Sequence, residues 1–165
     1  RILKKVINQN KFQNFSDKKR LVLINKLLNN FGIKNKLRRI GDVNMRIDSI
    51  GKINNMTALI SIEFGNDAVS LPRKLLEGYA IMHNRYKISK DKIILISIIH
   101  KLPNKRSDFY QVIDDVLKVL KIKIYTLPID ELSKLIKNKK KFTDFDLNDF
   151  FISRRIKNTL YKPTK

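Results

Sequence analysis

The run IILISII at residues 93–99 constrains the fold of this chain more than any other segment. All of its residues except Ser97 are aliphatic, and most of them are β-branched. A strand with one solvated face alternates apolar and polar residues, so an unbroken apolar run predicts a strand buried on both faces. We therefore predict that residues 93–99 form a central strand that is parallel to a neighbour.

One amphipathic helix is predicted before this strand in the sequence and another after it. Residues 68–86 carry an apolar stripe at helical spacing, with Pro72 tolerated in the first turn, and residues 108–120 carry a second stripe. A strand at residues 122–127 follows and is stopped by Pro128. This order of strand, helix and strand predicts a βαβ unit.

The preceding part, residues 36–65, has the period-2 pattern of half-buried strands. A short strand at residues 36–40 is predicted first, followed by a Gly-Asp turn. The next strand alternates apolar and polar residues, with Val43, Met45 and Ile47 against Asn44, Arg46 and Asp48. A turn-rich stretch at residues 51–55 then leads into a strand at residues 58–64. We expect a meander of two or three antiparallel strands.

Two helices complete the predicted core. Ser16 is the expected N-cap of a helix that ends at Gly32 and has Leu21, Ile24 and Leu27 at helical spacing. A short helix is predicted at residues 129–137, before a basic break and an acidic, aromatic segment.

These elements predict an α/β fold, with a mixed sheet in which an antiparallel meander is followed by a βαβ unit, flanked by helices. We divide the chain into a basic N-terminal extension at residues 1–15 and an α/β core at residues 16–138. An accessory C-terminal helix and a basic tail are expected at residues 139–165. Because the chain begins with Arg1, we take it as a fragment or a processed product.

The charge balance predicts a polyanionic partner. The chain has 36 Lys and Arg against 15 Asp and Glu, a formal charge of +21 in 165 residues. Such a field favours nucleic acid first, and an anionic membrane or a ribonucleoprotein particle second. Frequent Lys, Asn and Ile also suit AT-rich codons, which would inflate the lysine count, although codon bias does not remove acids. We expect an intracellular location, in the cytoplasm, the nucleus or an organelle.

Several classes of site and anchor are excluded. The chain has no Cys, so disulfides and thiolate metal sites are absent, and with only His83 and His100 a zinc site built on histidines is disfavoured. No apolar run approaches the roughly 20 residues of a membrane span. Both histidines are expected to be isolated surface or helix-end residues without a catalytic role.

Two carboxylates stand out in this cationic chain. The strand pattern places Asp48 and Glu63 on one face of the predicted hairpin, together with Arg46. A divalent metal beside a phosphodiester would explain why they are held together. The alternative is that both acids are ordinary residues on a solvated face, paired with Arg46 and Lys52.

The chain resembles the PD-(D/E)XK, or restriction-endonuclease-like, nuclease superfamily. The resemblance covers roughly residues 16–128 and rests on the order of elements and on two short motifs. These are Arg46-Ile47-Asp48 in the second strand and Ser61-Ile62-Glu63-Phe64-Gly65-Asn66 in the third, which are most similar to type II restriction enzymes.

The resemblance implies roles for particular residues. Asp48 and Glu63 would be catalytic ligands of Mg²⁺ or Mn²⁺, and Lys74 would supply a catalytic cation. Further predicted contacts with nucleic acid are Arg46, Lys52, Arg73, Lys139, Lys140 and Lys141. The lysines at 139–141 are equally typical of a solvated break between elements.

The chain departs from the family pattern at two positions. The pattern has Lys two residues after the second acid, where this chain has Gly65; in the other register, Ser61 takes the place of an acid. An inactive copy of the fold therefore remains an alternative.

Two function classes remain open. The first is a Mg²⁺-dependent DNA endonuclease, with RNA as a second substrate and a homodimer as one expected assembly. The second is a non-enzymatic RNA-binding protein, such as an organellar or lineage-specific ribosomal component.

Overall fold

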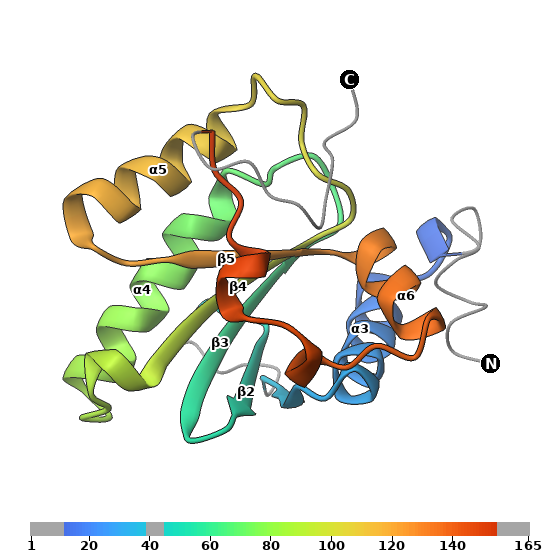
Figure 1. The fold of residues 1–165 in the computed structure, drawn as a ribbon, viewed down its shortest axis with the longest axis horizontal. Coiled ribbons are helices and arrows are strands. Elements are labelled where there is room, and N and C mark those ends of the chain that lie inside the picture. Colours follow the sequence, from blue (N-terminus) through green and yellow to red (C-terminus); the bar gives the residue numbers. More distant parts are fainter. Residues whose placement is uncertain (1–11, 39–44, 155–165) are drawn as a thin grey trace.

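The computed structural model describes residues 12–38 and 45–154, which form a five-stranded mixed sheet in the order β1-β2-β3-β4-β5 (Figure 1). The strands are β1 (Lys34–Leu37), β2 (Ser49–Ile53), β3 (Met56–Glu63), β4 (Ile93–Ile99) and β5 (Ile124–Pro128). Strands β1, β2 and β3 are antiparallel, whereas β3, β4 and β5 are parallel. The predicted fold class, a meander followed by a βαβ unit, is confirmed.

Helices cover both faces of the sheet. They are α3 (Asp17–Phe31), α4 (Ser70–Asn84), α5 (Asp108–Leu120) and α6 (Ile129–Lys137). Helices α4 and α5 lie on one face, and α3 and α6 lie together on the other (Figure 1). Both α4 and α5 connect neighbouring parallel strands, and such crossovers share one hand, which places the two helices on the same side. No helix in the described part of the chain is long and apolar enough to cross a membrane.

The central strands are buried as the apolar run predicts. Every residue of β4 is buried, including Ser97, whose hydroxyl lies 2.9 Å from the hydroxyl of Thr126 on β5. The residues of β3 between its two ends are also buried. Strands covered by helices on both faces need no polar alternation, which explains the unbroken apolar pattern.

The predicted boundaries of the meander are wrong. Strand β2 begins at Ser49, so Met45 to Asp48 lie before it, and the turn is a two-residue connection at Asn54 and Asn55. Asn54 has φ 52°, a conformation that Asn tolerates better than most residues.

Gly51 explains the misplaced turn. A Cβ atom at this residue would lie 3.1 Å from the carbonyl oxygen of Lys34 on the neighbouring strand. Gly51 therefore permits a close approach of β1 and β2 inside the sheet and does not form a turn. The first strand also shifts, from the predicted residues 36–40 to Lys34–Leu37, and residues 39–44 lie outside the described part of the chain.

The accessory C-terminal α-helix is not observed in the described residues. Two short 3₁₀ helices, η2 (Phe142–Asp144) and η3 (Leu147–Phe150), stand in its place. The side chain of Asp146 accepts a hydrogen bond from the backbone of Asn148, and that of Asp149 accepts one from the backbone of Asp146. Such local bonds compete with α-helix formation.

The aromatic residues of this segment belong to the core. Phe142 and Phe150 stack with ring centroids 5.4 Å apart, and each meets the ring of Phe31 on α3 edge-on. These residues are buried, so they are unavailable as a platform for stacking bases.

Helix α4 packs closely on the sheet at Gly78. A Cβ atom at Gly78 would lie 3.0 Å from Cγ2 of Ile47 and 3.3 Å from Cδ1 of Leu59. Ile47 directly precedes Asp48, so this contact helps to fix the segment that carries the predicted catalytic acid.

We predict that Gly78→Ala destabilises the fold by about 1–2 kcal/mol, because overpacking outweighs the better helix propensity of Ala. The matched control is Ala80→Gly at an exposed position of α4, which should cost about 1 kcal/mol from propensity alone. Urea unfolding of both variants measures the two effects. A stabilised Gly78→Ala variant would contradict the close packing.

Candidate functional site

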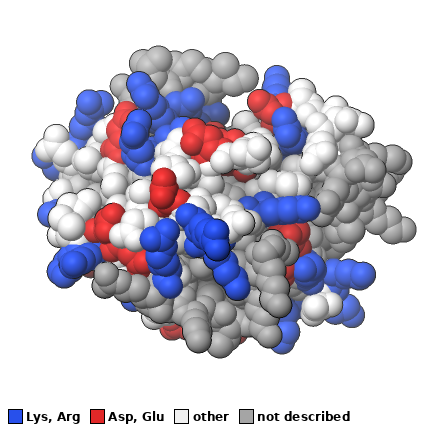
Figure 2. All heavy atoms as spheres, turned by 90° about the horizontal axis from the view of Figure 1, so that it is seen from above, with Lys and Arg blue, Asp and Glu red and all other residues white. Residues whose placement is uncertain are grey.

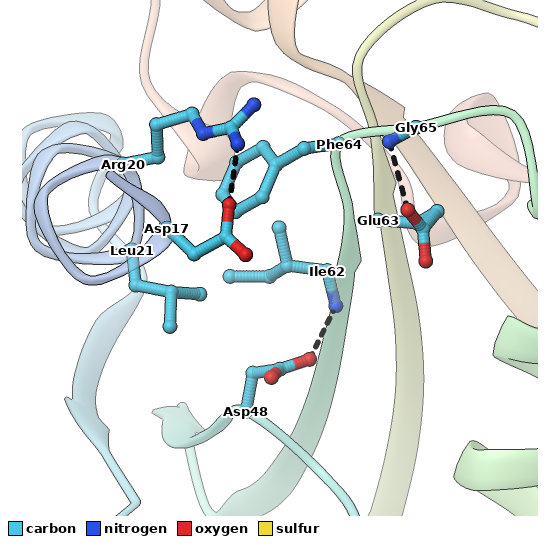
Figure 3. A pocket seen from close by; sticks show the side chains of 8 residues that line it. All are labelled: Asp17, Arg20, Leu21, Asp48, Ile62, Glu63, Phe64 and Gly65. Atoms are coloured by element: carbon cyan, nitrogen blue, oxygen red, sulfur yellow. Dashed lines mark hydrogen bonds and ion pairs between the residues drawn. The ribbon is translucent and has the colours of Figure 1, made fainter. Parts of the chain in front are cut away.

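A pocket of about 350 Å³ opens at the carboxyl end of β3 (Figure 3). Its walls come from the first turns of α3, the residue before β2 and the end of β3. The lining residues are Asp17, Arg20, Leu21, Asp48, Ile62, Glu63, Phe64 and Gly65. The pocket therefore contains three carboxylates and one guanidinium group.

Asp48 is held firmly at this pocket. Its Oδ2 accepts a hydrogen bond from the backbone N–H of Ile62 at 2.7 Å and one from Oγ of Ser61 at 3.3 Å. Its backbone N–H donates to the carbonyl of Ile60 at 3.0 Å. The other carboxylate oxygen, Oδ1, makes no hydrogen bond within the described part of the chain, so it is available to a ligand.

The pKa of the Asp48 carboxyl is raised above its usual value, because burial disfavours the charged form. The hydrogen bond from Ile62 and the positive charge of Lys74 oppose this effect, followed by the Ser61 hydroxyl and Arg38. The structure thus brings Lys74, on α4, close enough to Asp48 to stabilise its negative charge. A half-buried carboxylate whose pKa is perturbed by burial and by a nearby charge is found at many functional sites.

Glu63 lines the same pocket but is turned away from Asp48. Its Oε1 accepts a hydrogen bond from the backbone N–H of Gly65 at 2.7 Å. In Figure 3 the two carboxylates do not point toward one another. The bond to Gly65 is exposed, so rotating Glu63 toward the pocket would cost only about 1 kcal/mol.

The donor set fits an open magnesium site. Mg²⁺ is typically bound by one or two carboxylates, with water and substrate phosphate completing its shell. Asp48 offers Oδ1, which has no hydrogen-bond partner among the described residues, and Glu63 would add a second carboxylate after rotation. Across residues 12–38 and 45–154, no three acidic or histidine side chains are grouped so as to enclose a metal ion. The residues therefore suit a metal site in which a substrate phosphate completes the coordination shell, and not a site in which protein side chains supply every ligand.

Three of the residues predicted to contact nucleic acid do not line the pocket. Arg46 lies beside Asp48 in sequence and forms an ion pair with Glu77 of α4, with Nε and Oε1 3.9 Å apart. Arg73 is exposed on α4. Lys52 lies at the hairpin end of β2, paired with Thr57, and thus away from Asp48.

The lysine run at 139–141 is not part of the pocket. It follows α6, and Nζ of Lys141 donates a hydrogen bond to the carbonyl of Asn30 at 2.6 Å. Asn30 is at the end of α3 opposite to Asp17, which lines the pocket. Lys141 therefore ties the C-terminal segment to α3, while Lys139 and Lys140 are exposed.

Arg20 is a pocket residue that the sequence analysis does not predict. It forms an ion pair with Asp17, and its guanidinium lies over the ring of Phe64, 4.7 Å from the centroid. An Arg three residues after an acid in the first turn of a helix is the only signal in the sequence. Its contact with Phe64 depends on the tertiary fold.

His100 is half-buried and is not the isolated surface or helix-end residue that the sequence predicts. It lies just beyond β4, and its ring stacks on Phe12 with centroids 6.0 Å apart. Burial and the positive charges of Lys101 and Arg20 lower its pKa, against an opposing effect of Asp130. His100 does not line the pocket.

The charged side chains are distributed widely over the face drawn in Figure 2. In Figure 2 basic side chains are scattered over the visible face, with acidic groups between them. The excess of positive charge therefore forms a general field over this face and not a single stripe.

No family model matches the chain, and the search of curated proteins gives no relative.

We predict that Asp48→Asn raises the melting temperature at neutral pH. The carboxyl has a raised pKa in the folded protein, so its ionised form costs stability above that pKa, and Asn avoids this cost while keeping an acceptor for Ile62. The difference should shrink as the pH falls and vanish below the usual value of 3.8, where Asp48 is neutral in both the folded and unfolded states.

Thermal melts of both proteins across this pH range measure the effect. Asp67→Asn, an exposed acid after β3, is the matched control and should leave the melting temperature unchanged. A lower melting temperature for Asp48→Asn at neutral pH would contradict the raised pKa.

Proposed function

We propose that the protein binds nucleic acid and hydrolyses its phosphodiester bonds with Mg²⁺ or Mn²⁺, acting on DNA in preference to RNA. The observation that carries the proposal is the carboxylate of Asp48, which lines the pocket, is oriented by the N–H of Ile62 and is influenced by the positive charge of Lys74. The preference for DNA rests on the resemblance to type II restriction enzymes. Such a partner implies a location in the cytoplasm, the nucleus or an organelle.

Each residue has a defined task in this proposal. Asp48 would hold the metal through Oδ1, and Glu63 would be the second ligand if its bond to Gly65 were released. Lys74 neutralises charge that develops on the phosphate oxygens. Arg46, which lies before β2 and pairs with Glu77 of α4, steers the nucleic-acid backbone toward the pocket. The bound metal would supply an activated water and polarise the phosphate.

A second candidate function is nucleic-acid binding without cleavage, as in a ribosomal component. Two observations favour it. Ser61 donates a hydrogen bond to Asp48 from the position where the family pattern has an acid, and Glu63 bonds Gly65 instead of facing Asp48. An Asp48 that serves only to satisfy the N–H of Ile62 would fit both observations.

We predict metal-dependent cutting of plasmid DNA that Asp48→Asn reduces by about 100-fold or more. The reason is that Asn lacks the charge needed to hold the metal but keeps the hydrogen bond to Ile62, so the local structure is preserved. Glu63→Gln should also lower the rate, and Lys74→Met should lower it by about 100-fold. The measurement is gel-based cleavage with Mg²⁺ or Mn²⁺ against a chelator, with RNA assayed in parallel.

Asp67→Asn serves as the control and should cut at the rate of the unaltered protein. Salt-dependent binding without any cutting, unchanged by Asp48→Asn, would reject hydrolysis and leave the second candidate.

A further inference from the structure

Arg20 is placed at the pocket by packing more than by its ion pair. Its side chain is only 20% exposed and lies over Phe64, whereas the side chain of its partner Asp17 is 76% exposed. A cation over an aromatic ring is held by the ring's negative face, and the aliphatic part of Arg adds apolar contact. An exposed pair of charges, in contrast, contributes little to stability.

The guanidinium retains unused capacity to donate hydrogen bonds. Its Nε has no partner within the described residues, but it is buried, so an anion reaches it only after the side chain moves. Asp17 contacts one terminal nitrogen, NH2, of the same group. A guanidinium binds anions best through a planar, bidentate pair of bonds, which this single contact leaves unmade.

Cations from both faces of the sheet flank the end of β3. Arg20 comes from α3, and Lys74 comes from α4 on the opposite face (Figure 1). The guanidinium of Arg20 lies over the pocket residue Phe64, and the positive charge of Lys74 influences Asp48 although Lys74 does not line the pocket. A phosphate entering the pocket would therefore meet positive charge from α3 as well as from α4.

We propose that Arg20 binds a backbone phosphate of the nucleic acid at this pocket, and that Asp17 occupies the guanidinium until the phosphate replaces it. The identity of the partner rests on the proposed function, but cleavage is not required. A phosphate can accept two parallel hydrogen bonds from Arg, while the exposed bond to Asp17 is given up at little cost. Asp17 thus competes with nucleic acid for Arg20.

The first test measures binding of a labelled short DNA duplex by fluorescence anisotropy, with a chelator present so that no metal contributes. Arg20→Gln should weaken binding about 5–10-fold and reduce the salt dependence by about one phosphate contact. Lys26→Gln, which removes the same charge from an exposed position of α3, should change the affinity less than about 2-fold. Equal effects of the two substitutions would overturn the proposal.

A second variant guards against a folding defect in Arg20→Gln. Asp17→Asn, at a well-exposed residue, should tighten binding about 2–5-fold, because Arg20 is released from its competitor. Asp108→Asn is a matched control, since Asp108 also stands in the first turn of a helix after a Ser N-cap. It removes the same charge without affecting Arg20.

The double variant Asp17→Asn with Arg20→Gln separates competition from general repulsion. The gain from Asp17→Asn should disappear when Arg20 is absent. A gain that persists in the double variant, or that Asp108→Asn reproduces, would overturn the proposal. Absence of any binding by the unaltered protein would overturn it as well.

The outcomes of these tests are distinguishable from those for hydrolysis. An effect of Arg20 on binding, without metal-dependent cutting, supports the phosphate contact and rejects the nuclease. Cutting that depends on Asp48 but binding that is insensitive to Arg20 supports the nuclease and rejects this contact.

Discussion

The unequal lengths of β2 and β3 set the geometry on which the candidate site depends. The ladder between them pairs Ser49 with Ile60 and stops there, whereas β3 continues to Glu63. The N–H of Ile62 on this side therefore has no backbone partner from β2, and the carboxylate of Asp48 accepts its hydrogen bond instead. A buried N–H without an acceptor is costly, so this bond fixes the position of Asp48. The same bond leaves one carboxylate oxygen facing the pocket.

This arrangement bears on both roles considered for Asp48, the structural role and the metal-binding role. A carboxylate that satisfies a backbone N–H has a structural reason to exist, and burial makes its charged form expensive. An amide side chain would satisfy the same N–H without that expense. The charge is then the feature that a structural role leaves unexplained. A metal or another cation at the pocket would explain it.

The pocket also accounts for acids inside a cationic protein. Scattered Lys and Arg attract a polyanion from a distance but do not position it. Positioning requires groups with fixed geometry, and the described residues supply Arg20 against Phe64 and Asp48 against Ile62. Asp17 and Glu63 are tied by exposed bonds to Arg20 and Gly65, which an arriving ligand can replace.

Sequence periodicity predicts the larger elements well and the site only in part. The residues of β4, α5 and α6 follow from long apolar patterns, which depend on burial alone. The start of β2 does not follow from such a pattern. Gly51 has the sequence signature of a turn, but in the structure it allows β1 and β2 to approach closely.

Side-chain directions at the site are set by contacts that the strand pattern does not contain. The alternation of residues places Asp48 and Glu63 together, but the N–H of Gly65 turns Glu63 away. The sequence does not predict Arg20 as a pocket residue, because its contact Phe64 is far from it in the sequence. The C-terminal segment is predicted to form a helix, yet its Asp side chains accept local backbone hydrogen bonds in 3₁₀ turns, which compete with an α-helix.

The most direct measurement is anomalous diffraction from crystals of the protein grown with a short DNA duplex and Mn²⁺. If Asp48 and a backbone phosphate together hold the metal, the map should show an anomalous peak within about 2–2.5 Å of a carboxylate oxygen of Asp48, with the phosphate beside the peak. DNA bound elsewhere on the protein, or at the pocket with no Mn²⁺ at Asp48, would contradict the metal-dependent site.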